Sequence, residues 1–105
     1  MALLMKKDTA PCPIEKVVDL LGDNCSILIV RDLLEGPKRF SELECSLSGS
    51  TRTLAKKLKH LEKEGLVNRK KLAPSSTYEA YQLTKKGAAF EKVADAMRLY
   101  GKKYL

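Results

Sequence analysis

The stretch STRTLAKKLKHLEK at residues 50–63 combines an apolar stripe with a row of positive charges. Leu54, Leu58 and Leu61 recur at positions i, i+4 and i+7, a spacing that stacks side chains on one face of an α-helix. At about 100° per residue, the cations fall roughly on the opposite face; they are Arg52, Lys56, Lys59 and Lys63. The pattern predicts a helix whose leucines pack on a core while its cations face outward.

A short basic helix of this kind fits the major groove of duplex DNA, which is wide enough to admit one α-helix. The simpler alternative is a face exposed only to solvent, because lysine-rich helix faces are common. Ser50 precedes the helix and is expected to cap it. The helix alone leaves the DNA-binding face and the solvated face as alternatives.

Two segments upstream also carry helical patterns. A first helix is expected over residues 12–22, because Pro13 is tolerated in the first turn of a helix and Gly22 favours a helix end. Asp23 or Asn24 can cap a second helix, CSILIVRDLLEG, which ends at a Gly-Pro pair. Its apolar residues lie nearly all round, as expected at the centre of a core; they include Ile27, Leu28, Val30, Leu33 and Leu34.

A third, shorter helix is predicted between Phe40 and Leu47, where Phe40, Leu43 and Leu47 recur at i, i+3 and i+7. The turn SGS then leads into the basic helix. Two short helices joined by a tight turn, the second of them basic, make a helix-turn-helix. We place it at residues 40–64.

A β-hairpin is predicted directly after the helix-turn-helix, over residues 66–83. Its first strand carries Arg69, Lys70 and Lys71, and its second runs from Thr77 to Leu83 after a Pro-Ser-Ser turn. Because side chains alternate between the faces of a strand, Arg69 and Lys71 share one face and Lys70 lies on the other. A basic hairpin in this position is the plan of a winged helix, in which it lies against the DNA backbone.

The end of the chain predicts one last helix over residues 85–105, capped by Thr84. Its apolar stripe includes Phe90, Val93, Met97, Tyr100 and Tyr104, and little core remains for it to cover. We expect a partner subunit to cover this stripe, because apolar stripes on terminal helices often mark interaction surfaces. The alternative is that the helix packs back on its own domain.

Length, composition and charge set the class of the protein. The chain has 105 residues, of which 44% are apolar, a size and composition that predict one compact domain with a flexible tail at residues 1–11. The formal charge of +7 favours polyanionic partners such as nucleic acid or an anionic membrane surface. Between Thr51 and Lys71 there are eight cations and two acids, so the excess forms a patch. No apolar run approaches the length of a membrane span, and we expect a cytoplasmic protein with no membrane partner.

The titratable residues give no site for catalysis or metal binding. Three cysteines, Cys12, Cys25 and Cys45, lack the spacing of a zinc site or of a disulfide framework. The one histidine, His60, lies on the basic helix, and neither a carboxylate pair nor a phosphate-binding glycine loop accompanies it. We therefore expect no enzymatic activity, no metal and no cofactor.

Four motifs in order resemble the HxlR family of winged-helix transcription regulators, which is related to the MarR group. They are the Cys-Pro-Ile start at residues 12–14, the block RDLLEGPKRFSEL, the pattern L-x-x-L-x-x-x-G-L that ends at Leu66, and the segment LTKKG before the last helix. The resemblance covers the chain from Cys12 to the last helix. It implies a mostly helical winged helix-turn-helix with N- and C-terminal dimerisation helices. It also implies a homodimer that binds a near-palindromic operator in double-stranded DNA and acts as a repressor or an activator.

The resemblance also assigns roles to individual residues. The family's recognition helix falls on residues 51–63, and Arg52 is the best candidate for a base contact, because arginine can bind guanine through two hydrogen bonds. The full set of candidate DNA-binding residues is Ser50, Thr51, Arg52, Thr53, Lys56, Lys57, Lys59, Arg69 and Lys71. Lys57, Lys59 and Lys63 are expected to meet phosphates or water. The implied dimer interface is Ile14, Val17, Val18, Phe90, Val93, Met97, Tyr100 and Tyr104.

Cys12 stands at the position of a family cysteine that senses electrophiles or oxidants in some members. A thiol at a helix N-terminus has a stabilised thiolate, which raises its reactivity. The alternative is that Cys12 only caps the first helix. The family usually has a tryptophan early in the second helix, where this chain has Cys25, and no effector, whether a small molecule or an electrophile, can be assigned from the sequence.

Two other functions compete with a sequence-specific regulator of duplex DNA. An RNA-binding winged helix is expected to show exposed aromatic residues for base stacking, and the basic helix has none. A protein-interaction module with a merely solvated basic face would not bind DNA with a steep salt dependence. Binding measurements with DNA at two salt concentrations distinguish a protein-interaction module from a DNA-binding protein.

Overall fold

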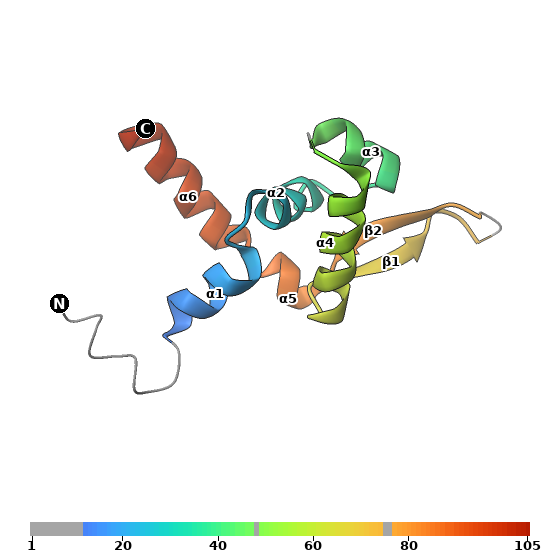
Figure 1. Cartoon of the computed structure of the whole chain (residues 1–105), viewed down its shortest axis with the longest axis horizontal. Helices are drawn as coiled ribbons and strands as arrows, with labels where there is room; N and C mark the ends of the chain where they lie inside the picture. The colour runs from blue at the N-terminus through green and yellow to red at the C-terminus, as the bar shows by residue number, and fades with distance from the viewer. Residues whose placement is uncertain (1–11, 48, 75–76) are drawn as a thin grey trace.

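The computed structural model describes residues 12–47, 49–74 and 77–105. The tail predicted at residues 1–11 lies outside the described residues, as do Ser48 and residues 75–76 of the predicted hairpin turn. The elements run in the order α1 (Pro13–Leu21), α2 (Asn24–Leu33), α3 (Phe40–Ser46), α4 (Thr51–Lys63), β1 (Val67–Lys71), β2 (Glu79–Leu83), α5 (Lys85–Ala88) and α6 (Glu91–Tyr104) (Figure 1).

The helix starts follow the capping residues in the sequence. At α2 the Asp23 carboxylate accepts a hydrogen bond from the Ser26 amide at 2.8 Å, which decides between the two predicted caps in favour of Asp23. At α4 the Ser50 hydroxyl accepts from the Thr53 amide at 3.0 Å, as predicted. Each bond satisfies a backbone N–H that has no partner within the helix.

The hydrophobic core forms around α2, which contacts α1, α3, α4 and β2. Its Ile29 and Val30 are fully buried, and the leucines of α3 and α4 pack against them. Ile27 and Leu28 are only partly buried, although their positions in an apolar helix predicted core. They face the C-terminal helix across a groove. The buried apolar residues of α2 are therefore Ile29, Val30 and Leu33.

The hairpin is antiparallel, with Val67 opposite Leu83 at its base and Lys71 opposite Glu79 toward its tip. The second strand begins at Glu79, two residues later than predicted. Lys38, between α2 and α3, forms a β-bridge with Tyr81, and the two residues exchange both backbone hydrogen bonds, at 2.7 and 3.0 Å. The hairpin is therefore tied along one edge to the segment that precedes α3.

The prediction of one continuous last helix is corrected by the structure, which divides it into α5 and α6 at Ala89–Phe90. Thr84 caps α5 as predicted and also donates from its hydroxyl to the Gly65 carbonyl at 2.6 Å. Gly87 packs directly against the Leu66 carbonyl, so α5 is held at the base of the hairpin. Phe90 then packs on the core, and the chain changes direction before α6 begins.

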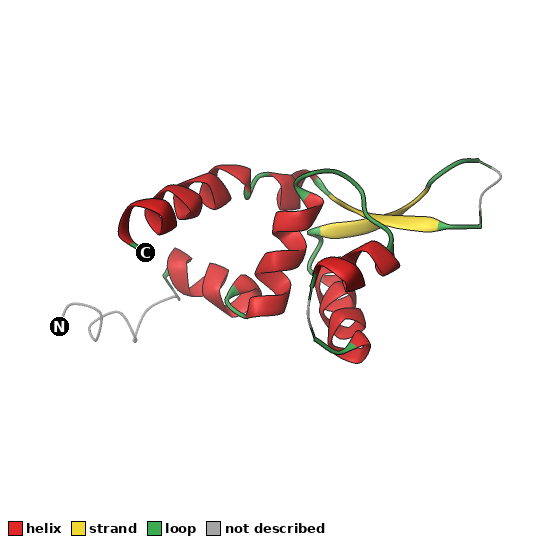
Figure 2. Ribbon diagram, turned by 90° about the horizontal axis from the view of Figure 1, so that it is seen from above, coloured by secondary structure: helices red, strands yellow, loops and turns green. Residues whose placement is uncertain are grey.

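The elements are arranged along the long axis of the molecule. Figures 1 and 2 show the hairpin extending from one end of the molecule, while α1 and α6 lie toward the other end. The helix pair α3–α4 lies between these two ends. This is the winged helix-turn-helix arrangement that the sequence predicts.

Candidate nucleic-acid interface

Helix α4 has the two faces that its sequence predicts. Leu54, Leu58 and Leu61 are buried, with at most 4% of their surface exposed. Opposite them the cations are exposed to solvent; they are Arg52, Lys56, Lys59 and Lys63. The buried stripe fixes the helix on α2, and the positive charge is held on the outer surface of the molecule.

The hydroxyl groups at the start of α4 are engaged within the protein. Ser50 caps the helix and donates from its own hydroxyl to Thr53 Oγ1 at 2.8 Å. Thr51 donates to a carboxylate oxygen of Glu44 in α3 at 2.6 Å, which joins the two helices of the motif. Arg52 makes no hydrogen bond or ion pair with the described residues, so its guanidinium is free to reach a partner outside the chain.

Lys57 lies differently from the other lysines of α4. Its ammonium is 3.5 Å from a carboxylate oxygen of Asp23, the N-cap of α2, and its side chain is about one-third exposed. Partial burial acts to raise the pKa of Asp23, but the Ser26 amide and Lys57 outweigh it and hold that pKa below its ordinary value. Lys57 therefore links α4 to the start of α2, a contact that the sequence pattern did not predict.

The cations of the hairpin also have different surroundings. Arg69 is bound by Glu62 of α4 through two hydrogen bonds, at 3.2 and 3.3 Å, and lies 3.8 Å from Glu79. The Glu62 carboxylate raises the pKa of Arg69 further above its ordinary value. Lys70 and Lys71 are exposed and have no ion pair with the described residues. Of the two cations predicted to share a face, only Lys71 is left unpaired.

Two contacts that sequence reasoning missed fix the helix-turn-helix and the hairpin. The Arg39 guanidinium lies 4.3 Å from the centre of the Tyr78 ring, so the start of α3 contacts the outer part of the hairpin. In the core, the buried carboxylate of Asp32 accepts hydrogen bonds from Ser46 at the end of α3 and from Arg31. No local signal identifies either contact, because the partners are far apart in the sequence or, for Arg31, adjacent in a helix.

The residues predicted to form the dimer interface are mostly exposed in the single chain. Seven of them expose between 44% and 74% of their surface: Ile14, Val17, Val18, Val93, Met97, Tyr100 and Tyr104. Phe90 differs, because it is partly buried against the protein's own core, where the turn between α5 and α6 places it. Leu99, which was not predicted, is 70% exposed. A groove between α1 and the start of α6 is lined by apolar residues such as Val17, Leu20 and Val93 and also by charged ones such as Lys16 and Glu64.

The cysteines have three different environments. Cys12 caps α1: its sulfur accepts from the Glu15 amide at 3.4 Å, and the Glu15 carboxylate accepts from the Cys12 amide at 3.3 Å. Burial raises the pKa of the Cys25 thiol, and Asp23 adds to that rise. Cys45 is exposed on α3. Among the described residues, no group of three or more potential ligands could hold a metal ion.

No described helix is both long and apolar enough to cross a lipid bilayer. The longest of the helices that the structure describes are α4 and α6, with 13 and 14 residues. Both carry charged side chains along their exposed faces.

Comparisons with known proteins agree with this geometry. The profile of a family described as HxlR-like helix-turn-helix matches residues 20–105. An uncharacterized HTH-type transcriptional regulator of Synechocystis is 39% identical over 95 residues, which span 90% of this chain and 70% of the relative. The HTH-type transcriptional regulator YodB of Bacillus subtilis is 35% identical over 95 residues, which span 89% of this chain and 85% of YodB.

Solved structures show the same fold. The reduced form of YodB superposes with a TM-score of 0.77 over 90% of this chain and 95% of YodB. The quinone-bound form of YodB superposes with a TM-score of 0.74 over 90% of this chain and 100% of the YodB chain. Both comparisons have 35% sequence identity.

Proposed function

This chain belongs to the HxlR-like helix-turn-helix family, and we propose that it is a sequence-specific regulator of transcription that binds double-stranded DNA as a homodimer. In this proposal α4 enters the major groove and the β1–β2 hairpin, the wing, lies on the backbone or in the minor groove. The protein acts in the cytoplasm, where it has access to DNA.

The observation that carries this proposal is the division of α4 into two faces. The leucines of α4 are fixed in the core, and its cations project outward. Helix α4 follows the short helix α3 across a tight turn. A helix held in this way keeps its orientation when it enters a groove, so that its outward side chains reach base edges. The basic wing beside it can add phosphate contacts, which supply affinity without sequence preference.

The residues of the interface take different roles in the proposal. Arg52 reads a base, because it is near the N-terminus of α4 and has no partner among the described residues. A guanidinium that binds guanine through two hydrogen bonds gives about 1–3 kcal/mol of discrimination. Thr51, Thr53 and Lys56 lie beside Arg52 and complete the groove contacts. Lys59 and Lys71 bind phosphates, while Lys57 and Arg69 act mainly by holding the recognition helix and the wing in place.

The homodimer is proposed to form through α1 and α6. Support comes from the exposed apolar side chains on both helices, which lie at the end of the molecule away from the wing (Figure 1). Two copies related by twofold symmetry present two recognition helices, and half-sites one helical turn apart then form an inverted repeat. The expected operator is therefore near-palindromic.

Selection of bound duplexes from a random DNA pool tests the proposal, followed by titration of the selected sequence and a scrambled one at two salt concentrations. We expect an inverted repeat whose preference the Arg52→Ala variant loses. Lys63→Ala is the matched control, because it removes one exposed cation from the far end of the same helix and should keep the preference. Salt-sensitive binding without a preferred sequence would contradict the proposal that α4 recognises bases in the major groove. Absence of binding would favour a protein-interaction module, and preference for RNA would favour an RNA-binding one.

We further propose that Cys12 is a candidate redox sensor as well as a helix cap. YodB, the relative described above, has been solved with a quinone bound. Alkylation of Cys12 would break the capping contact with Glu15 at the start of α1 and so alter the proposed dimer seam. Treatment with a small electrophile should then change DNA affinity in the wild-type protein and leave a Cys12→Ser variant unaffected. Unaltered DNA affinity after complete alkylation would show that Cys12 is a structural cap only.

A further inference from the structure

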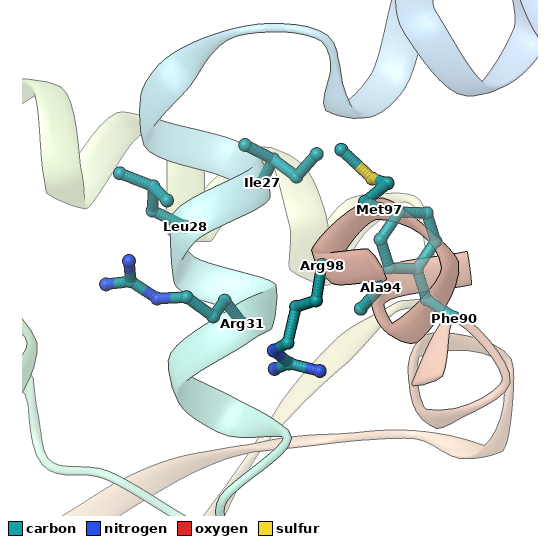
Figure 3. Close-up of a pocket in the computed structure, with 7 residues that line it drawn as sticks. All are labelled: Ile27, Leu28, Arg31, Phe90, Ala94, Met97 and Arg98. Carbon is teal, nitrogen blue, oxygen red and sulfur yellow. The ribbon is translucent and has the colours of Figure 1, made fainter. Parts of the chain in front are cut away.

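The large apolar side chains that are exposed in the described part of the chain fall into two groups. Most of them lie on α1 or between Val93 and Leu105, the surface of the proposed dimer, and Met97 of this group also lines the groove between α2 and α6 (Figure 3). The other two, Leu72 and Tyr78, lie on the hairpin and expose 50% and 59% of their surface. The proposed dimer does not account for this pair, because the hairpin extends from the opposite end of the molecule (Figure 1).

Leu72 and Tyr78 lie opposite each other in the outer part of the hairpin. The Leu72 amide donates to the Tyr78 carbonyl at 3.3 Å, which continues the ladder one step beyond the pair Lys71 and Glu79. Residues directly opposite in antiparallel strands place their side chains on the same face. Because side chains alternate along a strand, Lys70 shares this face, whereas Lys71 and Glu79 lie on the other one. We call Lys70, Leu72 and Tyr78 the outer wing face.

Arg39 joins the outer wing face to the helix-turn-helix. Its guanidinium lies 4.3 Å from the centre of the Tyr78 ring and forms no ion pair with a carboxylate of the described residues. Stacking on an aromatic ring leaves the N–H groups at the edge of a guanidinium available to other acceptors. Arg39 is the N-cap of α3, the first helix of the motif, and the first helix of a docked helix-turn-helix crosses the DNA backbone. In the proposed complex, the Arg39–Tyr78 contact therefore lies beside a DNA backbone.

The minor groove of DNA is complementary to this face. Its walls are formed by deoxyribose rings, which can cover apolar side chains and so recover free energy from surface that is exposed in the free protein. Several classes of DNA-binding protein place apolar side chains in this groove. The groove is bordered by phosphates on both sides, and Arg39 and Lys70 supply cations on either side of the apolar pair. A wing that bound phosphates alone would need only the exposed cations Lys70 and Lys71.

We propose that the outer wing face binds the minor groove, with the Tyr78 ring and Leu72 against the deoxyribose walls and Arg39 on a bordering phosphate. The contact lies at the outer flank of each half-site, because the wing is at the end of the molecule away from α1 and α6. This inference rests on the proposed function and deepens it, because it adds an apolar pair and a residue of α3 to the contacts made by the cations of β1.

Tyr78 is then also a residue that determines specificity. A-tracts have a narrow minor groove, which suits an extended arginine side chain. An aromatic ring beside a leucine is bulkier and requires a wider groove. The protein therefore discriminates against A-tracts at the outer flanks of its operator.

Hydroxyl-radical footprinting of the selected operator tests the contact directly, because the radical attacks deoxyribose from the minor groove. The wild-type protein should protect the sugars at the outer flank of each half-site. Tyr78→Ala should lose this protection and keep the protection over the half-sites, whereas Tyr78→Phe retains the ring and should keep both. Flank protection that is absent from the wild-type protein, or unchanged in Tyr78→Ala, would overturn the proposal.

Affinity measurements separate a DNA contact from a role in folding. Tyr78→Ala should weaken binding to the flanked operator about tenfold without changing the salt dependence, because it removes apolar contact and no charge. Lys71→Ala, on the other face of the hairpin, is the matched control and should reduce the salt dependence. On a duplex trimmed to the two half-sites, the wild-type protein and Tyr78→Ala should bind equally. An equal loss on both duplexes would show that Tyr78 only supports the fold of the wing.

The role of Arg39 is tested by a double variant on the flanked operator. Arg39→Ala should weaken binding, and the combination with Tyr78→Ala should be weaker than the product of the two single effects, because both residues act in one contact. Purely multiplicative effects would show that Arg39 does not hold the Tyr78 ring in the complex.

Two operators that differ only in their outer flanks test specificity. The wild-type protein should bind mixed-sequence flanks about fivefold more tightly than A-tract flanks, and Tyr78→Ala should bind the two equally. Equal binding by the wild-type protein would contradict the specificity assigned to Tyr78. A wild-type protein that selects no duplex sequence would contradict the proposed function. Selection of an inverted repeat that Tyr78→Ala binds with wild-type affinity would overturn this inference alone.

Discussion

At the scale of single residues, cations that are equivalent in the sequence pattern have different surroundings in the structure. Arg52 projects from the start of α4 without a partner among the described residues, whereas Lys57 is 3.5 Å from Asp23. In the wing, Arg69 is held by Glu62 and Lys71 is unpaired among those residues. A positive charge that already has an acidic partner must give up that interaction before it can bind a phosphate. We therefore expect paired and unpaired cations to affect DNA binding differently.

The wing offers a direct comparison of the two kinds of cation. Lys71→Ala should reduce the slope of the salt dependence of DNA binding by about one unit, because one phosphate is then no longer neutralised. Arg69→Ala should have a smaller effect on this slope and lower the free energy of unfolding by about 0.5–1 kcal/mol, because it removes a two-point ion pair on the surface. Salt titrations of DNA affinity and urea unfolding measure the two effects. Equal changes in slope would show that Arg69 also binds phosphate.

Asp23 is expected to make stability depend on pH on the acid side. Burial raises its pKa, but the Ser26 amide and Lys57 lower it by more, so the folded value lies below the unfolded one. The stabilisation is therefore complete above the ordinary pKa of aspartate and is lost as pH falls through the folded value. Asp23→Asn should reduce stability at pH 7 by up to about 1 kcal/mol, the range of an exposed ion pair.

Urea unfolding at pH 7 and at pH 3 checks this prediction. The difference between the wild-type protein and Asp23→Asn should shrink at the lower pH, because pH 3 lies below the ordinary pKa of aspartate and the stabilisation by the carboxylate declines there. Asp19→Asn is the control, since Asp19 is an exposed carboxylate on α1. A difference that stays constant with pH would show that Asp23 acts only as a helix cap.

At the scale of elements, the sequence predicted those features that depend on local residue patterns, such as helix bounds and the order of helices and strands. The leucine spacing and Ser50 gave the bounds of α4, and the order of helices and strands gave the fold. The pairing of Lys57 with Asp23 and of Lys38 with Tyr81 could not be predicted, because each depends on how distant elements pack. The last helix was predicted as one piece because no proline or cap residue interrupts it. Its division results from tertiary contacts of Gly87 and Phe90.

Two glycines near the C-terminus should respond in opposite ways to alanine. A Cβ atom on Gly87 would overlap the Leu66 carbonyl oxygen and lie 3.0 Å from Leu83, whereas one on Gly101 in α6 meets no heavy atom within 4 Å. Gly87→Ala should therefore destabilise the protein by about 1–3 kcal/mol, the range for overpacking. Gly101→Ala should stabilise it by about 0.4–1 kcal/mol, because it restricts the unfolded chain.

Thermal unfolding of the two glycine variants at equal protein concentration checks this pair of predictions. The melting temperature should fall for Gly87→Ala and rise for Gly101→Ala. A neutral Gly87→Ala variant would mean that α5 can move away from the base of the wing.

At the scale of the whole molecule, the wing and the terminal helices lie at opposite ends (Figures 1 and 2). The helix-turn-helix lies between them, so a surface on α1 and α6 can bind a partner without covering the candidate DNA interface. The ring centroids of Tyr100 and Tyr104 lie 5.1 Å apart on this surface, with the rings tilted at 43° to each other, and both side chains are more than half exposed. The proposed DNA interface and the proposed dimer surface therefore do not overlap.

Tyr100→Glu should disrupt the proposed dimer, because it places a charge within an apolar seam. Light scattering after size-exclusion chromatography should give the mass of one chain for this variant and of two chains for the wild-type protein. Lys102→Ala makes the same change in net charge on a different face of α6 and should remain dimeric. The Tyr100→Glu variant should also lose affinity for an inverted repeat and keep its affinity for a single half-site. A monomeric wild-type protein would contradict the dimer proposal.

The break between α5 and α6 is a point at which a small rotation would displace the far end of α6. Helix α6 has 14 residues and is therefore about 21 Å long. A tilt of about 10° at Phe90 displaces its far end by about 4 Å, close to the rise of about 3.4 Å between successive bases. If two copies are joined through α6, a small rotation at one turn shifts the two recognition helices by about one base pair along the duplex. In the proposed complex, the spacing of the half-sites then depends on Ala89–Phe90, far from the side chains proposed to contact DNA.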